Sequence, residues 1–320
     1  MELRQLRYFV SIIECGSLSK AADLLYIAQP SLSLQVREME TELKTQLLFR
    51  SSQGVKPTEA GKTLYRHARE VLRQMEDMGQ QVKHGAGSEA GEVEVGFPTT
   101  IAAVLAHPLF GCIHAKYPGI YLHIRESSST YLAEMLANGR LDMAVLFRHM
   151  PTRGVSVQPL FDEALFVYGR LATGKRLPDD VCPMQQLDGV PMVLPSSFQA
   201  LRLIVERTFA RAGLRLNVVA DVDSLRTRML IAQEGSVCTI LAASNELILK
   251  REKRRHPPFR RVVDPGMSRP VSLCWPNSLP PNPASIAVYR TIIELVRELV
   301  HHEAVMGVRL RDINASEYSL

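Results

Sequence analysis

The sequence has few cysteines and aromatic residues, and it has no long apolar run. Aromatic residues make up 6% of the 320 residues, with a single tryptophan. No stretch reaches the roughly 18 apolar residues that a membrane-spanning helix needs, and the segment after Met1 lacks the apolar core of a secretory signal. We therefore expect a cytoplasmic protein with no membrane partner.

The cysteines are an odd and scattered set, namely Cys15, Cys112, Cys182, Cys238 and Cys274. Such a set fits the reduced thiols of a cytoplasm better than a disulfide framework. No Cys-x-x-Cys pair occurs, so we expect no metal site. Cys182 and Cys238 both fall in the predicted second lobe, which leaves a peroxide-sensing thiol pair open, although buried inert thiols are the more common case.

The sequence also lacks the common catalytic signatures. It contains no G-x-G-x-x-G, no G-x-x-x-x-G-K-[ST] and no G-x-S-x-G. We therefore expect no catalytic residues, no cofactor and no enzymatic activity. A two-lobed α/β enzyme, or a solute-binding protein with an unrelated helical bundle at its N-terminus, remains the alternative.

Residues 1–58 show short helical patterns separated by tight turns. Apolar residues recur at helical spacing over 3–13, and Gly16 should end that helix. A second helix carries the small residue Ala21, which lets another helix approach closely. Pro30 suits the first position of a third helix, where its missing N–H costs nothing.

The third helix combines an apolar stripe with a polar outer face. We expect the stripe to be buried, and it consists of Leu32, Val36, Met39 and Leu43. Two helices joined by a short turn, the second with a polar outer face, are typical of a helix-turn-helix. Residues 47–56 then indicate two short strands around a glycine-containing tip, as in a wing. From spacing alone, a small helical bundle with no DNA role is an equal alternative.

Residues 59–88 are predicted to form a long linker helix, with Thr58 as its N-cap. Its apolar residues are spaced 4-3-4-3-4, which is a heptad seam; they are Leu64, Ala68, Val71, Met75, Met78 and Val82. No second helix of this kind occurs in the chain. We therefore predict a homodimer through this helix, the alternative being that it packs on the rest of its own chain.

Residues 89–305 alternate strand and helix patterns, which predicts an α/β domain of two doubly wound lobes. Lobe I takes about 92–161 and 265–305, lobe II takes about 162–264, and residues 306–320 form a tail. Two lobes joined by crossing connections place a ligand cleft between them, at the carboxyl ends of the strands.

Hydroxyl side chains occur in pairs at three predicted strand-to-helix turns of this domain. Hydroxyls and free N–H groups at helix N-termini suit an anion, although N-capping explains any one pair. We predict a cleft for a small anionic effector, lined by Thr99, Thr100, Ser128, Ser129, Ser196 and Ser197, with Arg202 as a possible cation.

Several segments together resemble the LysR-type transcriptional regulators. They are Leu6-Arg7-Tyr8-Phe9-Val10, Gly16-Ser17-Leu18-Ser19-Lys20-Ala21-Ala22, Gln29-Pro30-Ser31-Leu32-Ser33, Val55-Lys56-Pro57-Thr58-Glu59-Ala60-Gly61, Glu126-Ser127-Ser128-Ser129 and Gly139-Arg140-Leu141-Asp142-Met143-Ala144-Val145. Leu47-Leu48-Phe49-Arg50 and Leu194-Pro195-Ser196-Ser197 are similar to the branch that contains the nitrogen-assimilation-control regulator. The resemblance covers nearly the whole chain.

The resemblance implies a winged helix-turn-helix, a dimerising linker helix and a two-lobed effector domain like a periplasmic binding protein. It implies a homotetramer that binds double-stranded DNA at an interrupted palindrome, and it allows a contact with RNA polymerase. By analogy with the family, the residues that touch DNA would be Gln29, Pro30, Ser31, Ser33 and Arg50. Two positions depart from the family: Leu34 and Gln53 stand where arginine is common.

The residue types on this face suit DNA. Gln29 can both donate to and accept from adenine, and Leu34 can contact a thymine methyl group, although ordinary surface exposure is the somewhat better explanation of Leu34. Residues 1–87 hold 12 basic and 10 acidic residues, so binding needs a locally positive face. The candidates for phosphate contacts are Arg4, Lys20, Arg37, Arg50 and Lys56.

Overall fold

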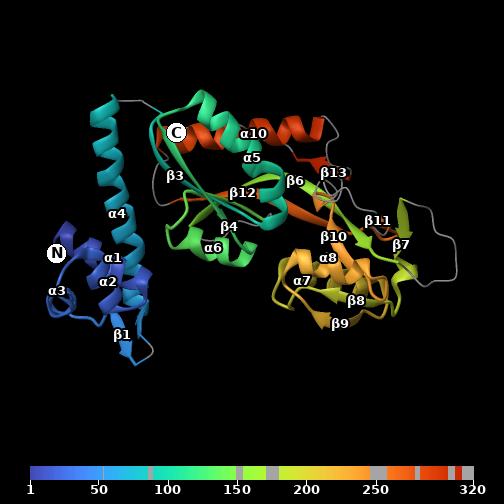
Figure 1. The fold of residues 1–320 in the computed structure, drawn as a ribbon, viewed down its shortest axis with the longest axis horizontal. Helices are drawn as coiled ribbons and strands as arrows, with labels where there is room; N and C mark the ends of the chain where they lie inside the picture. Colours follow the sequence, from blue (N-terminus) through green and yellow to red (C-terminus); the bar gives the residue numbers. More distant parts are fainter. Residues whose placement is uncertain are drawn as a thin grey trace.

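The computed structural model describes residues 1–52, 54–85, 89–148, 154–170, 180–245, 258–277, 282–301 and 307–311. A small N-terminal head sits at one end of a long helix, and a two-lobed domain follows it (Figure 1). Gln53 lies outside the described residues, and so do the basic run 250–255 and the pair His302 and Glu303. No helix within the described ranges is long and apolar enough to cross a membrane.

The head is built on α1 (Leu3–Cys15), α2 (Leu18–Leu25) and α3 (Gln29–Glu42). Gly16 ends α1 as predicted, with the left-handed φ of 62° that favours glycine. Leu32, Val36 and Met39 are buried in the head core. The expectation that Leu43 is also buried is wrong, because α3 ends at Glu42 and Leu43, its C-cap, is 40% exposed.

The predicted wing is a hairpin of β1 (Leu48–Ser51) and β2 (Gly54–Pro57). The backbone N–H of Val55 donates to the carbonyl of Gly16 at 2.9 Å. A side chain at Gly54 would bring its Cβ within 2.5 Å of that same carbonyl oxygen, so this close approach requires glycine. The wing is therefore attached to the turn between α1 and α2.

The long helix α4 (Glu59–His84) starts inside the head and extends out of it (Figure 1). Thr58 caps it by accepting a hydrogen bond from the N–H of Gly61 at 3.0 Å. Tyr65 and Ala68 are buried in the head core. Beyond them the apolar seam is exposed in the single chain, at Val71, Met75, Met78 and Val82.

Lobe I is built on three parallel strands of the large sheet, with helices on both faces. Its elements are β3 (Gly91–Phe97), α5 (Thr99–Lys116), β4 (Ile120–Glu126), α6 (Ser129–Ala137), β5 (Met143–Leu146) and α10 (Pro283–His301). Val93, Val95 and Val145 pack with α5 and α10 on one face. Ala144 and Leu146 point the other way and pack with α6. This alternation is the two-residue period of a strand whose two faces are both buried.

Lobe II has its own apolar core. Its elements are β7 (Val181–Pro183), the 3-10 turn η1 (Met184–Leu187), β8 (Pro191–Leu194), α7 (Ala200–Ala212), β9 (Asn217–Asp221), α8 (Leu225–Gln233), β10 (Thr239–Ala242) and β11 (Phe259–Val263). The short helix α8 was not predicted from the sequence. That helix begins after Ser224, whose hydroxyl accepts from the N–H of Thr227.

Two long antiparallel strands, β6 (Val155–Tyr168) and β12 (Ser268–Pro276), run between the lobes. Along β6, Leu160 belongs to the core of lobe I and Leu165 to the core of lobe II. The predicted passage between lobes at 161–162 thus falls inside one continuous strand. Part of the expected tail is also ordered structure: β13 (Val308–Leu310) pairs with β6.

Candidate functional site

The polar face of α3 is open to solvent. Seven of the eight predicted DNA-contacting residues are exposed, namely Gln29, Pro30, Ser31, Leu34, Arg37, Arg50 and Lys56, and Ser33 is half-buried. Leu34 is 54% exposed and lies opposite the buried stripe, as the helical spacing predicts. A leucine in that position contributes nothing to the head core.

The wing and α3 are joined on this face through Arg50. Its guanidinium donates to the hydroxyl of Ser33 at 3.0 Å and lies 3.7 Å from the carboxylate of Glu40. The other oxygen of Glu40 accepts the backbone N–H groups of Leu47 and Leu48, at the start of the wing. Two residues predicted to touch DNA from different elements are therefore held side by side.

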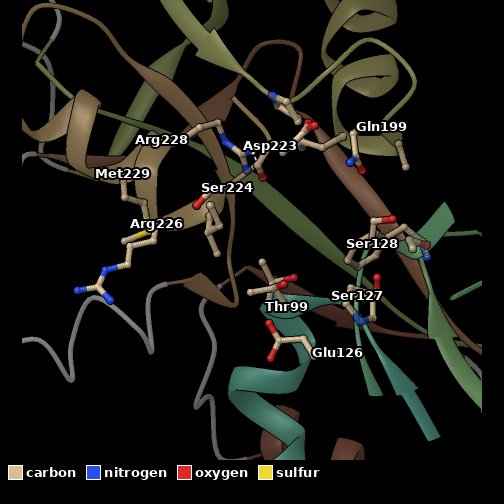
Figure 2. Close-up of a pocket in the computed structure, with 18 of the residues that line it drawn as sticks. Thr99, Glu126, Ser127, Ser128, Gln199, Asp223, Ser224, Arg226, Arg228 and Met229 are labelled. Carbon is tan, nitrogen blue, oxygen red and sulfur yellow. Dashed lines mark hydrogen bonds between the residues drawn. The ribbon is translucent and has the colours of Figure 1, made fainter. Parts of the chain in front are cut away.

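A cavity of about 1100 Å³ lies between the two lobes. Figure 2 shows Thr99, Glu126, Ser127 and Ser128 of lobe I on one side of it and side chains of lobe II on the other. Its walls include Thr99, Thr100, Glu126, Ser127, Ser128, Ser129, Phe147, Tyr168, Gln199, Asp223, Ser224, Arg226, Arg228, Met229, Gln233 and Arg269.

The side chains of Thr99 and Thr100, in the cavity wall, do not cap a helix. The N-cap of α5 is Pro98, and no side chain caps that helix. Thr100 instead accepts a hydrogen bond from Arg269 at 2.7 Å. Thr99 is exposed to the cavity.

The two serines of lobe I have structural partners as well as a place in the wall. Ser128 is the N-cap of α6 and accepts the N–H of Tyr131 at 3.3 Å. Ser129 accepts the N–H of Phe147 at 3.2 Å, which ties the start of α6 to the end of β5. A ligand at these hydroxyls would therefore touch the first turn of α6.

The structure places the other three predicted effector residues outside the cavity wall. Both the N–H and the hydroxyl of Ser196 donate to the carboxylate of Asp223, each at 2.9 Å. Ser197 is exposed. Arg202 pairs with Glu206 at 2.7 Å and with Asp221 at 2.8 Å, so its charge is balanced within lobe II.

Arg228, on α8, is a wall residue that the sequence reading missed. Its side chain donates to the carbonyls of Val222 at 2.8 Å and Asp223 at 3.0 Å, and the residue is 5% exposed. Its buried Nε has no hydrogen-bond partner among the described residues. The Asp223 group that accepts from Arg228 is the backbone carbonyl and not the carboxylate. Burial lowers the pKa of Arg228 to about 10, against the opposing charge of Asp223, so the group is still cationic at neutral pH.

Arg269 lies at the base of the cavity, where the crossing strands meet. It stands opposite Glu163 in the β6–β12 register and forms a hydrogen-bonded ion pair with it. Arg269 is 3% exposed and Glu163 fully buried. The second carboxylate oxygen of Glu163 accepts the N–H of Ser244 at 3.2 Å, and the guanidinium of Arg269 stacks 3.8 Å above the ring of Phe147. The pair thus connects groups from both lobes.

The two arginines left different signals in the sequence. Ser224 directly precedes Leu225-Arg226-Thr227-Arg228-Met229, and a serine in that position is a helix N-cap signal. That signal would have placed Arg228 in the first turn of a helix that follows a strand. Arg269 stands alone before an apolar run. Nothing near it in the sequence indicates the buried carboxylate that it meets, because Glu163 is 106 residues away.

Two family models match most of this architecture. Residues 3–62 match the bacterial regulatory helix-turn-helix protein, lysR family, and residues 86–298 match the LysR substrate binding domain. The chain belongs to the LysR family. It is a DNA-binding transcriptional regulator with an effector-binding domain, and the LysR expectation for fold and function is confirmed.

Two LysR relatives are nitrogen assimilation regulatory proteins named nac. The one from Escherichia coli (strain K12) is 36% identical over 302 residues, which is 92% of this chain and 95% of that protein. The one from Klebsiella aerogenes is 35% identical over the same shares. They confirm the similarity expected from Leu47–Arg50 and Leu194–Ser197. A full-length OxyR variant from Pseudomonas aeruginosa shares the fold, with a TM-score of 0.70 at 24% identity, over 93% of this chain and 98% of that one.

Proposed function

We propose that a small organic anion, bound in the cavity between the lobes, controls DNA binding by this LysR regulator. The supporting observation is Arg228, a buried cation in the cavity wall whose Nε has no hydrogen-bond partner among the described residues. The charge of Asp223 compensates this cation only in part, because its carboxylate is bound to Ser196. An incompletely compensated buried charge costs free energy, and an anionic ligand would lower that cost. Hydroxyls of Thr99, Thr100 and Ser128 face the same space and can donate to the same anion.

The position of these groups suggests how the anion would act. Arg228 belongs to lobe II, whereas the hydroxyl groups belong to lobe I. An anion that contacts both would favour a closed arrangement of the lobes over an open one. It can change DNA affinity only by the difference in its affinity for the two arrangements.

We also propose how the regulator assembles and reads DNA. The exposed seam of α4 would pack against a second copy, as its heptad spacing predicts. Two such dimers would form the homotetramer implied by the family, acting in the cytoplasm and near RNA polymerase. Gln29, Pro30, Ser31, Ser33 and Leu34 would face base edges, and Arg37, Arg50 and Lys56 would contact phosphates. The role is regulatory, and it requires no catalytic group or cofactor.

The anion proposal predicts a difference between two arginines of lobe II. In a thermal-unfolding screen with mono- and dicarboxylates and inorganic phosphate, at least one anion should stabilise the wild type. At 100 times its Kd the gain is about 2.7 kcal/mol. Arg228→Met should abolish this gain. Arg202→Met is the matched control, since Arg202 is equally cationic but lies outside the wall, and it should keep the gain.

The same anion should change the affinity of the wild type for DNA. A gain that survives Arg228→Met, or one that disappears equally in Arg202→Met, would contradict the assignment of the site to Arg228. Stabilisation by none of these anions would contradict the proposed effector class.

A further inference from the structure

The linker helix α4 touches lobe I through two arginines one helical turn apart. Arg73 forms an ion pair with Asp142 and donates to the hydroxyl of Ser285, at the start of α10, at 3.3 Å. Arg69 donates to the carbonyl of Gly139 at 3.5 Å. Residues four apart share one face of a helix, so this face of α4 is fixed to the segment 139–142.

The segment 139–142 is itself held tightly to the sheet of lobe I. Asp142 is 8% exposed. Its carboxylate accepts the N–H of Glu94 on β3 at 2.7 Å, and its own N–H donates to the carbonyl of Glu94 at 2.9 Å. Because Asp142 is held to β3 and pairs with Arg73, a displacement of this segment would also displace α4.

The same segment directly follows α6, whose other end forms part of the cavity wall. α6 begins at Ser129 and ends at Ala137, about 13 Å further along its axis. Leu132 and Leu136 pack into a buried cluster with Leu141. The helix and the segment after it thus share one small core, and they should move together when the first turn of α6 is displaced.

On the head side, Arg69 also reaches α1. Its guanidinium forms an ion pair with Glu14 at 3.1 Å, and Glu14 accepts the hydroxyl of the buried Tyr65 at 2.9 Å. Arg69 therefore has one partner in the DNA-binding head and another in lobe I. A change at Gly139 can reach α1 through this single side chain.

We propose that α6 couples the cavity to the DNA-binding head through the contacts of Arg69 and Arg73 with residues 139–142, which we call the linker latch. An occupant at Ser128 and Ser129 shifts the first turn of α6, and the latch passes that shift to α4 and α1. This inference rests on the proposed function for its physiological trigger. The mechanical coupling itself exists without any ligand, so it can be tested without one.

The test is a double-mutant cycle in the full-length protein. Ser129→Ala removes the acceptor that ties α6 to β5, and Arg73→Ala opens the latch. The readout is the Kd for a genomic fragment enriched by the wild-type protein, measured by fluorescence anisotropy. Allosteric couplings typically amount to 5- to 150-fold in affinity. We expect Ser129→Ala to change the Kd by at least about 5-fold in the wild type and by less than about 2-fold in the Arg73→Ala background.

Two further variants protect the interpretation. Asp142→Asn keeps an oxygen that can accept the N–H of Glu94, but it removes the ion pair with Arg73. It should therefore suppress the effect of Ser129→Ala on the Kd as Arg73→Ala does, and it replaces Arg73→Ala in the cycle if Arg73→Ala does not fold. Arg66→Ala changes an exposed arginine of the same helix and should leave the effect of Ser129→Ala intact.

Two results would overturn the linker latch. One is an effect of Ser129→Ala that is equally large with Arg73 or Asp142 replaced. The other is no effect of Ser129→Ala on DNA affinity in the wild type. Because the cycle contains no anion, its failure is distinct from a failure of the anion screen.

Discussion

Replacing Glu163 with alanine is expected to lower the free energy of unfolding by about 3–5 kcal/mol. The substitution leaves Arg269 buried at the meeting point of the lobes without its counter-charge. It also removes the acceptor of the Ser244 N–H. For a domain of this size we expect a fall in melting temperature of roughly 10 °C, measured by calorimetry on the full-length protein.

The matched control replaces both charges at once. Glu163→Leu combined with Arg269→Met leaves no unpaired charge, and such exchanges are often close to neutral. We therefore expect the double variant to unfold near the wild-type temperature while Glu163→Ala does not. Equal destabilisation by both would show that volume, and not the unpaired charge, dominates at this position.

Replacing Gln29 with alanine is expected to weaken binding to a preferred DNA fragment by about 10- to 100-fold. This corresponds to the roughly 1–3 kcal/mol that a good two-point contact with a base contributes. Gln29 is exposed in the first turn of α3, and no described contact in the head requires its side chain. Affinity for random DNA should hardly change, as a fluorescence titration against both duplexes would show.

Lys56 on the wing provides the contrasting case. Lys56→Ala should weaken binding to preferred and random DNA alike, and it should reduce the slope of log affinity against log salt by about 1. If Gln29→Ala instead weakened both duplexes equally and flattened the salt slope, its role would be that of a phosphate contact. A base-reading role would then be wrong.

The head was readable from its sequence because its signals are local. The stop at Gly16, the cap at Thr58 and the stripe from Leu32 to Met39 each depend on residues a few positions apart, and each is present in the structure. Leu43 was assigned wrongly because helix periodicity does not say where the helix ends. The lobes were readable for the same reason, whereas α8 was missed although its N-cap, Ser224, is a local signal of the same kind.

Four of the six hydroxyl residues predicted for the cavity line it, whereas its buried arginines were not predicted. Thr99, Thr100, Ser128 and Ser129 follow strands directly, so topology alone brought them to one cleft. The buried ion pair of Glu163 and Arg269 depends on the register between β6 and β12, which are far apart in the sequence. Local sequence patterns do not determine that register. Arg202 was predicted as a cation of the cavity, but its charge is balanced by Glu206 on the same helix and by Asp221 on β9.

Competition between DNA fragments tests whether the polar face of α3 reads base sequence. Genomic fragments retained by the purified full-length protein would be titrated against random duplexes of equal length, at one fixed physiological salt concentration. We expect the retained fragments to bind at least on the order of 1,000-fold more tightly than the random duplexes. Equal affinity of natively folded protein for both sets would contradict this expectation.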